Sequence, residues 1–321
     1  MKKLITAVLF LICLGLAEQG IAQSTSYVGA QTQEKKEEKK KNEIKFECGS
    51  HSFPMKIASL STNPPFGWVD TVKATKLSDP VNVGQGFGVD LIKKVANDLN
   101  IAVRPMGFNS YQETLKALNN GSIDLFIGAY YDTRFIRTGN VFVTPSFFKN
   151  IIQVVFPAGK EKPVEKFEDL IGLKGVVRTD EEFYSLIYRG LPKELNIRQV
   201  SSSQEAFTLL MTGEVDYLLG SPYSAEAEAR RFKIENDIVY NEKPLADLEM
   251  FLVFSGNSKC LPLRQKIVDQ LRIETKDPFS VRNKLVDQIN AWGQRFADDK
   301  GLLETETNPT TPSPATQAQR K

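Results

Sequence analysis

The chain has 321 residues and a net charge of +2, with 41 Lys and Arg against 39 Asp and Glu. The positive residues are spread along the chain, whereas a nucleic-acid-binding protein concentrates them on one face, so the sequence argues against nucleic acid as a partner. Three cysteines and one histidine leave little material for a metal centre.

The first 22 residues have the layout of a secretory signal peptide. Lys2 and Lys3 precede the apolar run LITAVLFLICLGLA, and small residues stand at Gly20 and Ala22. The apolar run is shorter than the roughly 20 residues that a membrane span needs. We therefore expect residues 1–22 to be cleaved after Ala22 and the remainder to be exported.

Both ends of the remaining chain are expected to be disordered. Residues 23–47 carry the mixed-charge run EKKEEKKK and almost no large apolar residue, which predicts a disordered linker. Residues 303–321 are rich in Thr, Pro and Ala and are predicted to be a disordered tail. About 255 residues lie between these ends, which is enough for two modest lobes.

Two cysteines remain after signal removal, Cys48 and Cys260. In an oxidising compartment two cysteines are often paired, whereas a metal site would need His or more Cys nearby. The only histidine is His51, close to Cys48. The sequence favours a structural disulfide over a metal site.

The first folded elements are a strand, a loop and a helix. Met55 and Ile57 alternate as in a strand, and a loop with Asn63 follows. Phe66 and Trp68 either face a ligand or pack under this loop. The segment GQGFGVDLIKKVANDLN then predicts an amphipathic helix that starts near Asp90, and its glycines do not make a dinucleotide-binding fingerprint. The apolar stripe of this helix is Leu91, Ile92, Val95, Ala96 and Leu99.

A unit of helix, turn and strand occurs twice. Residues 111–131, YQETLKALNNGSIDLFIGAYY, align without a gap with residues 203–223, SQEAFTLLMTGEVDYLLGSPY, at a constant offset of 92. A helix that feeds a buried strand is half of an α/β unit, so two copies predict two α/β lobes of similar build. Function is then expected in the cleft between the lobes. The identities are Gln112/Gln204, Glu113/Glu205, Leu118/Leu210, Gly121/Gly213, Asp124/Asp216, Gly128/Gly220 and Tyr131/Tyr223.

Polar groups follow the strand of the first copy. Tyr130, Tyr131, Arg134 and Arg137 stand just beyond it, where a small ligand would meet the chain. Arg binds a carboxylate with two parallel hydrogen bonds, and Tyr supplies a ring face and a hydroxyl. We expect one of the two arginines in the cleft; the alternative is a surface pair with Asp132.

The remaining elements complete two lobes. Residues 150–157, NIIQVVFP, predict a strand that carries the chain into the second lobe, and EMFLVFS predicts the strand that returns it, which brings Cys260 into the lobe of Cys48. A strand at Gly175 precedes a helix capped by Thr179 or Asp180. The expected bounds are 48–148 and 248–302 for lobe 1 and 149–247 for lobe 2.

The order of these segments resembles the bacterial periplasmic solute-binding proteins of the amino-acid type, extracellular solute-binding protein family 3, over residues 52–302. The segments are GFGVDLIKKVANDL, SYQETLKALNNGSIDLFIGAYYDTR, VTPSFF, FEDLIGLKGVVR and SSSQEAFTLLMTGEVDYLLGS. The resemblance implies two α/β lobes joined by two crossing hinge strands, a type 2 periplasmic binding fold. It also implies a small solute closed between the lobes, an ABC transporter permease as partner, a monomer and no cofactor.

The resemblance also implies a set of ligand-binding residues. Tyr111 matches an aromatic residue that stacks on the ligand, and the carboxylate-binding arginine of the family falls on Arg134 or Arg137. The full set is Asn63, Phe66, Tyr111, Gly128, Ala129, Tyr130, Tyr131, Arg134, Arg137, Thr179 and Ser221.

The sequence departs from the family at two places. The strand of the second repeat ends in GSPYS, without the acid that pairs with a ligand amine, and Arg178 and Thr179 stand where the family has Gly-Thr. A small organic acid therefore fits about as well as an amino acid. The alternatives are a periplasmic lyase or dehydratase-like enzyme on the same fold, which would need a general acid or base that the sequence hardly offers, and a ligand-sensing module for a membrane receptor.

Overall fold

The computed structural model describes residues 48–71, 82–179, 182–299 and 301. The expected signal peptide (1–22), linker (23–47) and C-terminal tail (303–321) lie outside these residues. In the described part of the chain, no helix has the length and apolarity that crossing a membrane requires.

Lobe 1 is built on a mixed sheet in the order β5-β1-β6-β12-β7. The first three strands run parallel, and β12 and β7 run antiparallel to their neighbours. A small antiparallel sheet, β2-β3-β4, lies beside it. The strands of lobe 1 are β1 (Met55–Leu60), β2 (Thr62–Asn63), β3 (Gly67–Thr71), β4 (Asn82–Gln85), β5 (Val103–Phe108), β6 (Leu125–Tyr130), β7 (Val141–Pro157) and β12 (Ala246–Phe254).

Helices cover both faces of this sheet. One face packs against the apolar stripe of α2 and against α8, and the other against α3 and the short α4. The predicted stripe is confirmed, since Leu91, Ile92, Val95 and Ala96 are buried. The helices are α2 (Phe87–Asp98), α3 (Tyr111–Asn119), α4 (Thr133–Arg137), η3 (Leu261–Leu263), α8 (Arg264–Glu274) and α9 (Pro278–Gln294).

Lobe 2 repeats the same plan with fewer strands. Its sheet runs β7-β10-β8-β9, with β11 also paired to β7. Its elements are η1 (Phe167–Leu170), β8 (Lys174–Arg178), α5 (Glu182–Ile187), η2 (Tyr188–Gly190), β9 (Asn196–Val200), α6 (Ser203–Thr212), β10 (Tyr217–Gly220), α7 (Pro222–Phe232) and β11 (Ile238–Tyr240).

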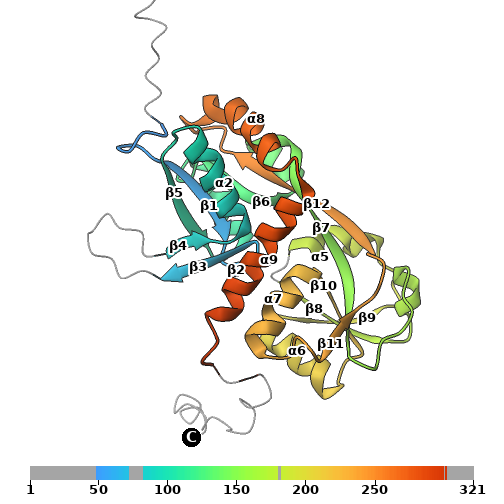
Figure 1. The fold of residues 1–321 in the computed structure, drawn as a ribbon. Coiled ribbons are helices and arrows are strands. Elements are labelled where there is room, and N and C mark those ends of the chain that lie inside the picture. Colours follow the sequence, from blue (N-terminus) through green and yellow to red (C-terminus); the bar gives the residue numbers. More distant parts are fainter. Residues whose placement is uncertain (1–47, 72–81, 180–181, 300, 302–321) are drawn as a thin grey trace, which may run out of the picture. The chain divides into compact units, whose positions relative to one another are not determined.

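Two strands join the lobes. The 17-residue β7 pairs with β12 along its first part and with β10 and β11 along its second part. Figure 1 shows β7 and β12 running together from the sheet that carries β1 and β6 towards the sheet that carries β8 and β10. The predicted fold, two α/β lobes joined by two crossing strands, is confirmed.

The sequence repeat has a clear structural meaning. In lobe 1 the Asp124 carboxylate accepts a hydrogen bond from the Lys56 amide at 2.8 Å, and in lobe 2 the Asp216 carboxylate accepts one from the Lys174 amide at 2.7 Å. Each aspartate thus fixes the start of the neighbouring parallel strand, β1 or β8. A buried or strand-edge amide needs such a partner, so the two lobes use the same solution at the same position.

The helices of the repeat also begin alike. The hydroxyl of Ser110 accepts from the Glu113 amide, and that of Ser202 accepts from the Glu205 amide, each at 3.2 Å. Serine at this position satisfies one of the free amides of the first helical turn.

A disulfide between Cys48 and Cys260 closes lobe 1 across a sequence separation of 212. It ties the chain just before β1 to the chain just after β12. The preference for a disulfide over a metal site is therefore confirmed.

Candidate functional site

The loop between β1 and β3 is held by the start of α2. The Phe87 amide donates to the Pro65 carbonyl at 2.9 Å, and the Gly88 amide donates to the Phe66 carbonyl at 3.4 Å. Gly86 has a φ of 112°, and a Cβ there would lie 2.6 Å from the Phe66 oxygen, so only glycine fits this close approach. These bonds fix the loop, which carries Asn63 and Phe66 at the edge of lobe 1.

This loop contacts lobe 2 directly. The Arg178 guanidinium donates to the Thr62 carbonyl at 2.8 Å, and the Ser224 hydroxyl donates to the Asn63 side-chain oxygen at 2.9 Å. Arg178 ends β8 and Ser224 lies in the first turn of α7, so the groups come from the rim of lobe 2 that faces lobe 1. The two rims are therefore in contact in this conformation.

An aromatic cluster lies beside these hydrogen bonds. The ring of Phe66 packs against Phe148 at 5.4 Å and edge-on against Tyr223 at 6.1 Å, between ring centroids. Phe148 and Tyr223 also contact each other at 5.6 Å. Phe66 is only 5% exposed, so the loop residue that either faces a ligand or packs inwards is buried between the lobes here.

Charged groups stand behind the lobe 2 rim. Arg178 is buried and also donates to the Ser203 hydroxyl at 2.7 Å. Glu228 on α7 is 3% exposed and accepts from Arg231 at 3.3 Å. Burial raises the pKa of the Glu228 carboxyl above its usual value, although Arg231 and Arg178 act in the opposite direction. The rim of lobe 2 is thus a buried polar cluster with two arginines and one carboxyl group.

A second polar chain crosses near the hinge strands. The Asn150 amide nitrogen donates to the Tyr130 hydroxyl at 2.8 Å, and its oxygen accepts from the Ser221 hydroxyl at 2.7 Å. Tyr130 ends β6 in lobe 1 and Ser221 precedes α7 in lobe 2, so Asn150 on β7 links both. The structure brings these two predicted residues together through an asparagine that the sequence did not single out.

A small cavity remains on the lobe 1 side of the contact. Its volume is about 10 Å³, and Ser59, Phe66, Ile127, Gly128 and Met250 are among its lining residues. This is room for about one water molecule. The Ser59 hydroxyl is buried and has no hydrogen-bond partner within the described part of the chain, so a water here would satisfy it.

Other predicted residues lie away from these contacts. Tyr111 is buried on the α3 and α4 face of lobe 1, edge-on to Phe126 and Phe135. The Arg134 guanidinium lies 5.5 Å from the centre of the Tyr111 ring and pairs with Asp132. In this structure Arg134 therefore forms the local pair with Asp132 that the sequence offered as the alternative to a position in the cleft.

The last four predicted ligand-binding residues also take no part in the contacts between the two rims. Tyr131 is 56% exposed and packs on Phe142. Arg137 is exposed, and Ala129 is fully buried in the core of lobe 1. The Thr179 hydroxyl donates to the Val200 carbonyl at 3.1 Å within lobe 2. As ligand contacts these residues stay predictions.

The C-terminal helix α9 contacts both lobes. Its Trp292 packs against Trp68 of β3 at 5.6 Å between ring centroids, and its Gln288 donates to Asp90 of α2 at 2.8 Å. On the other side, Arg230 of α7 donates to Asn290 at 2.6 Å. The expected bounds placed this segment in lobe 1, because the order of segments along the chain does not say which elements a helix contacts.

Sequence reasoning passed over most of the contact residues. Arg178 was visible as a departure from the family pattern, and Asn150 as a polar residue at the start of an apolar run. Tyr223 was visible as a repeat identity and, with Ser224, as part of the segment GSPYS that departs from the family. Phe148, Ser203 and Glu228 gave no signal of their own, because each stands in a segment that reads as ordinary strand or helix.

Comparison with known proteins agrees with this architecture. The family model for bacterial extracellular solute-binding proteins, family 3, matches residues 55–300. A search of the curated proteins found no match.

Solved structures with the same fold are numerous. The GluR0 ligand-binding core in complex with L-glutamate has a TM-score of 0.57 at 16% identity, covering 76% of this chain and 99% of that one. An amino acid ABC transporter substrate-binding protein, AbpA from Streptococcus pneumoniae bound to L-arginine, has a TM-score of 0.56 at 15% identity, covering 74% and 95%. A mutant of ArgBP from T. maritima has a TM-score of 0.52 at 18% identity, covering 75% and 95%.

These identities are low enough that the structural likeness speaks for the fold alone, whereas the family model spans most of the chain. The chain therefore belongs to the bacterial extracellular solute-binding proteins of family 3.

Proposed function

We propose that this protein captures a small polar solute between its two lobes in the periplasm and presents it to an ABC importer, without chemistry of its own. The observation that supports this most directly is the pair of facing rims, which meet through hydrogen bonds and aromatic contacts beside two shared strands. Lobes joined in this way close when a ligand contacts both of them.

The residues that bind the solute can be inferred from the contacts that hold the two rims together in this conformation. Arg178 and Ser224 bind the Thr62 carbonyl and Asn63, and a solute that enters the opened cleft takes the place of these lobe 1 partners. Phe66 and Tyr223 then supply apolar contact on either side. The cavity of about 10 Å³ is far too small for a solute, so binding requires the rims to separate first.

Arg178 is the cation best placed to bind an anionic solute. It stands on the rim that faces lobe 1, whereas Arg134 pairs with Asp132 on the α4 side of lobe 1. A guanidinium binds a carboxylate with paired, charge-assisted hydrogen bonds. Glu228, whose carboxyl group lies near Arg178, is already bonded to Arg231 and so is a poor partner for a ligand amine. We therefore favour a small organic acid over an amino acid.

The test begins with native mass spectrometry of the purified protein, to identify a retained solute, followed by titration of that solute. Loss of one charge-assisted contact costs about 1.5–3 kcal/mol, so Arg178→Gln is expected to weaken binding roughly 10- to 100-fold. Arg134→Ala and Arg137→Ala serve as matched controls and are expected to bind normally.

A thermal scan must show that Arg178→Gln is folded, and Ser224→Ala gives a second, smaller perturbation of the same rim. Normal binding by Arg178→Gln, together with loss of binding in Arg134→Ala or Arg137→Ala, would reject Arg178 as the solute-binding cation. The solute would then bind near the loop after β6.

A further inference from the structure

A larger cavity lies in lobe 1, on residues that the proposed solute site does not use. Its volume is about 460 Å³, within the range of roughly 300–1,000 Å³ that is usual for small-molecule sites. Its walls come from residues 48–56, the start of β5, the turn before β6 and the chain that leads from β12 to Cys260. None of the residues that join the two rims lines it.

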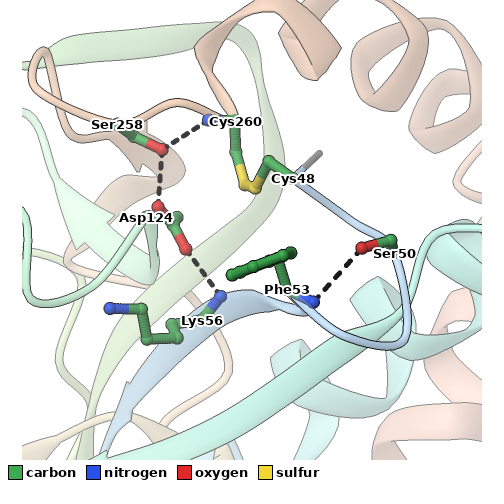
Figure 2. Close-up of a disulfide and its surroundings, with 7 residues drawn as sticks. All are labelled: Cys48, Ser50, Phe53, Lys56, Asp124, Ser258 and Cys260. Carbon is green, nitrogen blue, oxygen red and sulfur yellow. Dashed lines mark hydrogen bonds between the residues drawn. A yellow bond between two sulfur atoms is a disulfide. The ribbon is translucent and has the colours of Figure 1, made fainter. Parts of the chain in front are cut away.

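A network of bonds holds these walls in place, as Figure 2 shows. The Asp124 carboxylate accepts from the Lys56 amide at 2.8 Å with one oxygen and from the Ser258 hydroxyl at 2.6 Å with the other. The Ser258 oxygen in turn accepts from the Cys260 amide at 2.9 Å, and the disulfide ties Cys260 to Cys48. The cavity is thus preorganised by two hydrogen-bonded strand ends and a covalent link.

The charges around the cavity are unbalanced. Lys56 and Lys259 line it, against the carboxylate of Asp124. Both Asp124 oxygens already accept hydrogen bonds from groups in the wall. Within the described part of the chain, Lys56 and Lys259 form no ion pair. The lining therefore carries an excess of positive charge that attracts an anion.

The lining also offers apolar contact. Phe53 stands at the cavity with 60% of its surface exposed, and in Figure 2 its ring extends from the loop towards the space beneath Cys48. A large exposed aromatic residue next to polar groups is typical of a ligand site.

We propose that this cavity is a second binding site, for a small organic anion that carries two or more carboxylate or phosphate groups. The cations bind the acidic groups, and Phe53 covers the carbon skeleton. The proposal does not rest on the proposed solute site, because the two sites share no residue.

The test is isothermal titration calorimetry of the full chain with citrate and with inorganic phosphate at low salt. Citrate is expected to bind, and more tightly than phosphate, because it presents more acidic groups and a carbon skeleton. Exposed charge pairs are individually weak, so Lys259→Gln is expected to raise the citrate Kd about threefold and Lys56→Gln/Lys259→Gln about tenfold. Lys193→Gln, an equal change of charge at an exposed site in lobe 2, is expected to leave the Kd unchanged.

Acetylation of lysines, read by mass spectrometry, locates the bound anion. Citrate is expected to protect Lys56 and Lys259 but not Lys193, and to leave tryptophan emission unchanged, because neither tryptophan lines this cavity. Absence of citrate binding would overturn the proposal. So would an equal effect of Lys193→Gln, or binding that protects neither lysine of the cavity.

Discussion

The repeated aspartates allow one matched experiment on what holds each lobe together. Asp124→Ala removes the acceptor for both the Lys56 amide and the Ser258 hydroxyl, in a site where Asp124 is 7% exposed. Asp216→Ala, the equivalent change in lobe 2, removes the acceptor for the Lys174 amide alone, at an exposed position.

The expected costs follow from these counts. A hydrogen bond to a charged group contributes about 1.5–3 kcal/mol, and a buried donor left unpaired costs its desolvation. Asp124→Ala is therefore expected to lower the free energy of unfolding by about 3–5 kcal/mol. Asp216→Ala is expected to lower it by about 1 kcal/mol, because water replaces the lost acceptor.

Thermal scans of both variants measure the difference. For a protein of this size 1 kcal/mol shifts Tm by about 2–4 °C, so Asp124→Ala is expected to melt roughly 10 °C lower and Asp216→Ala about 3 °C lower. An equal or larger loss in Asp216→Ala would refute the reasoning, since the two carboxylates would then not differ by the Ser258 bond and by burial.

Three further predictions concern other parts of the fold. Removal of the disulfide in Cys48→Ala/Cys260→Ala should cost up to about 5 kcal/mol in urea unfolding, because a sequence separation of 212 gives a large loss of unfolded-state entropy; a loss below about 1 kcal/mol would contradict this. The raised pKa of Glu228 means that its contribution to stability is most favourable below its ordinary value of 4.5 and declines as pH rises through the folded-state value. The Tm of Glu228→Gln relative to the unchanged protein should therefore increase as the pH rises above about 4.5, and a constant difference would speak against a buried, destabilised carboxylate. Trp292→Ala should cost about 3 kcal/mol and shift the emission of the remaining Trp68 to the red, because it removes the indole that covers Trp68; an unchanged emission spectrum would show that the two rings do not pack together in solution.

Much of the fold could be predicted because its signals are local. The repeat, the glycines that follow its helices and the apolar stripe of α2 each depend on residues close together in sequence. The structure confirms the two lobes that they imply. The lobe bounds at 149–247 and 248–302 are not tested by these contacts and stay predictions.

The candidate site was harder to predict, because facing groups are chosen by tertiary packing. Both Arg134 and Arg178 are visible in the sequence, but Asp132 caps α4 and pairs with Arg134, while Arg178 at the end of β8 donates to the Thr62 carbonyl of lobe 1. Likewise, the sequence placed residues 248–302 in lobe 1 and could not show that the apolar side of α9 packs on α7 as well as β3.

The position of α9 has a consequence for how the cleft can open. If β7 and β12 were the only connection, one lobe could rotate against the other about these two strands with little resistance. A helix bonded through Gln288 to α2 and through Asn290 to α7 adds a third attachment between the lobes. Separation of the rims must then also detach this helix from one lobe, so the speed of solute entry is expected to depend on the contacts of α9 as much as on the strands that join the lobes.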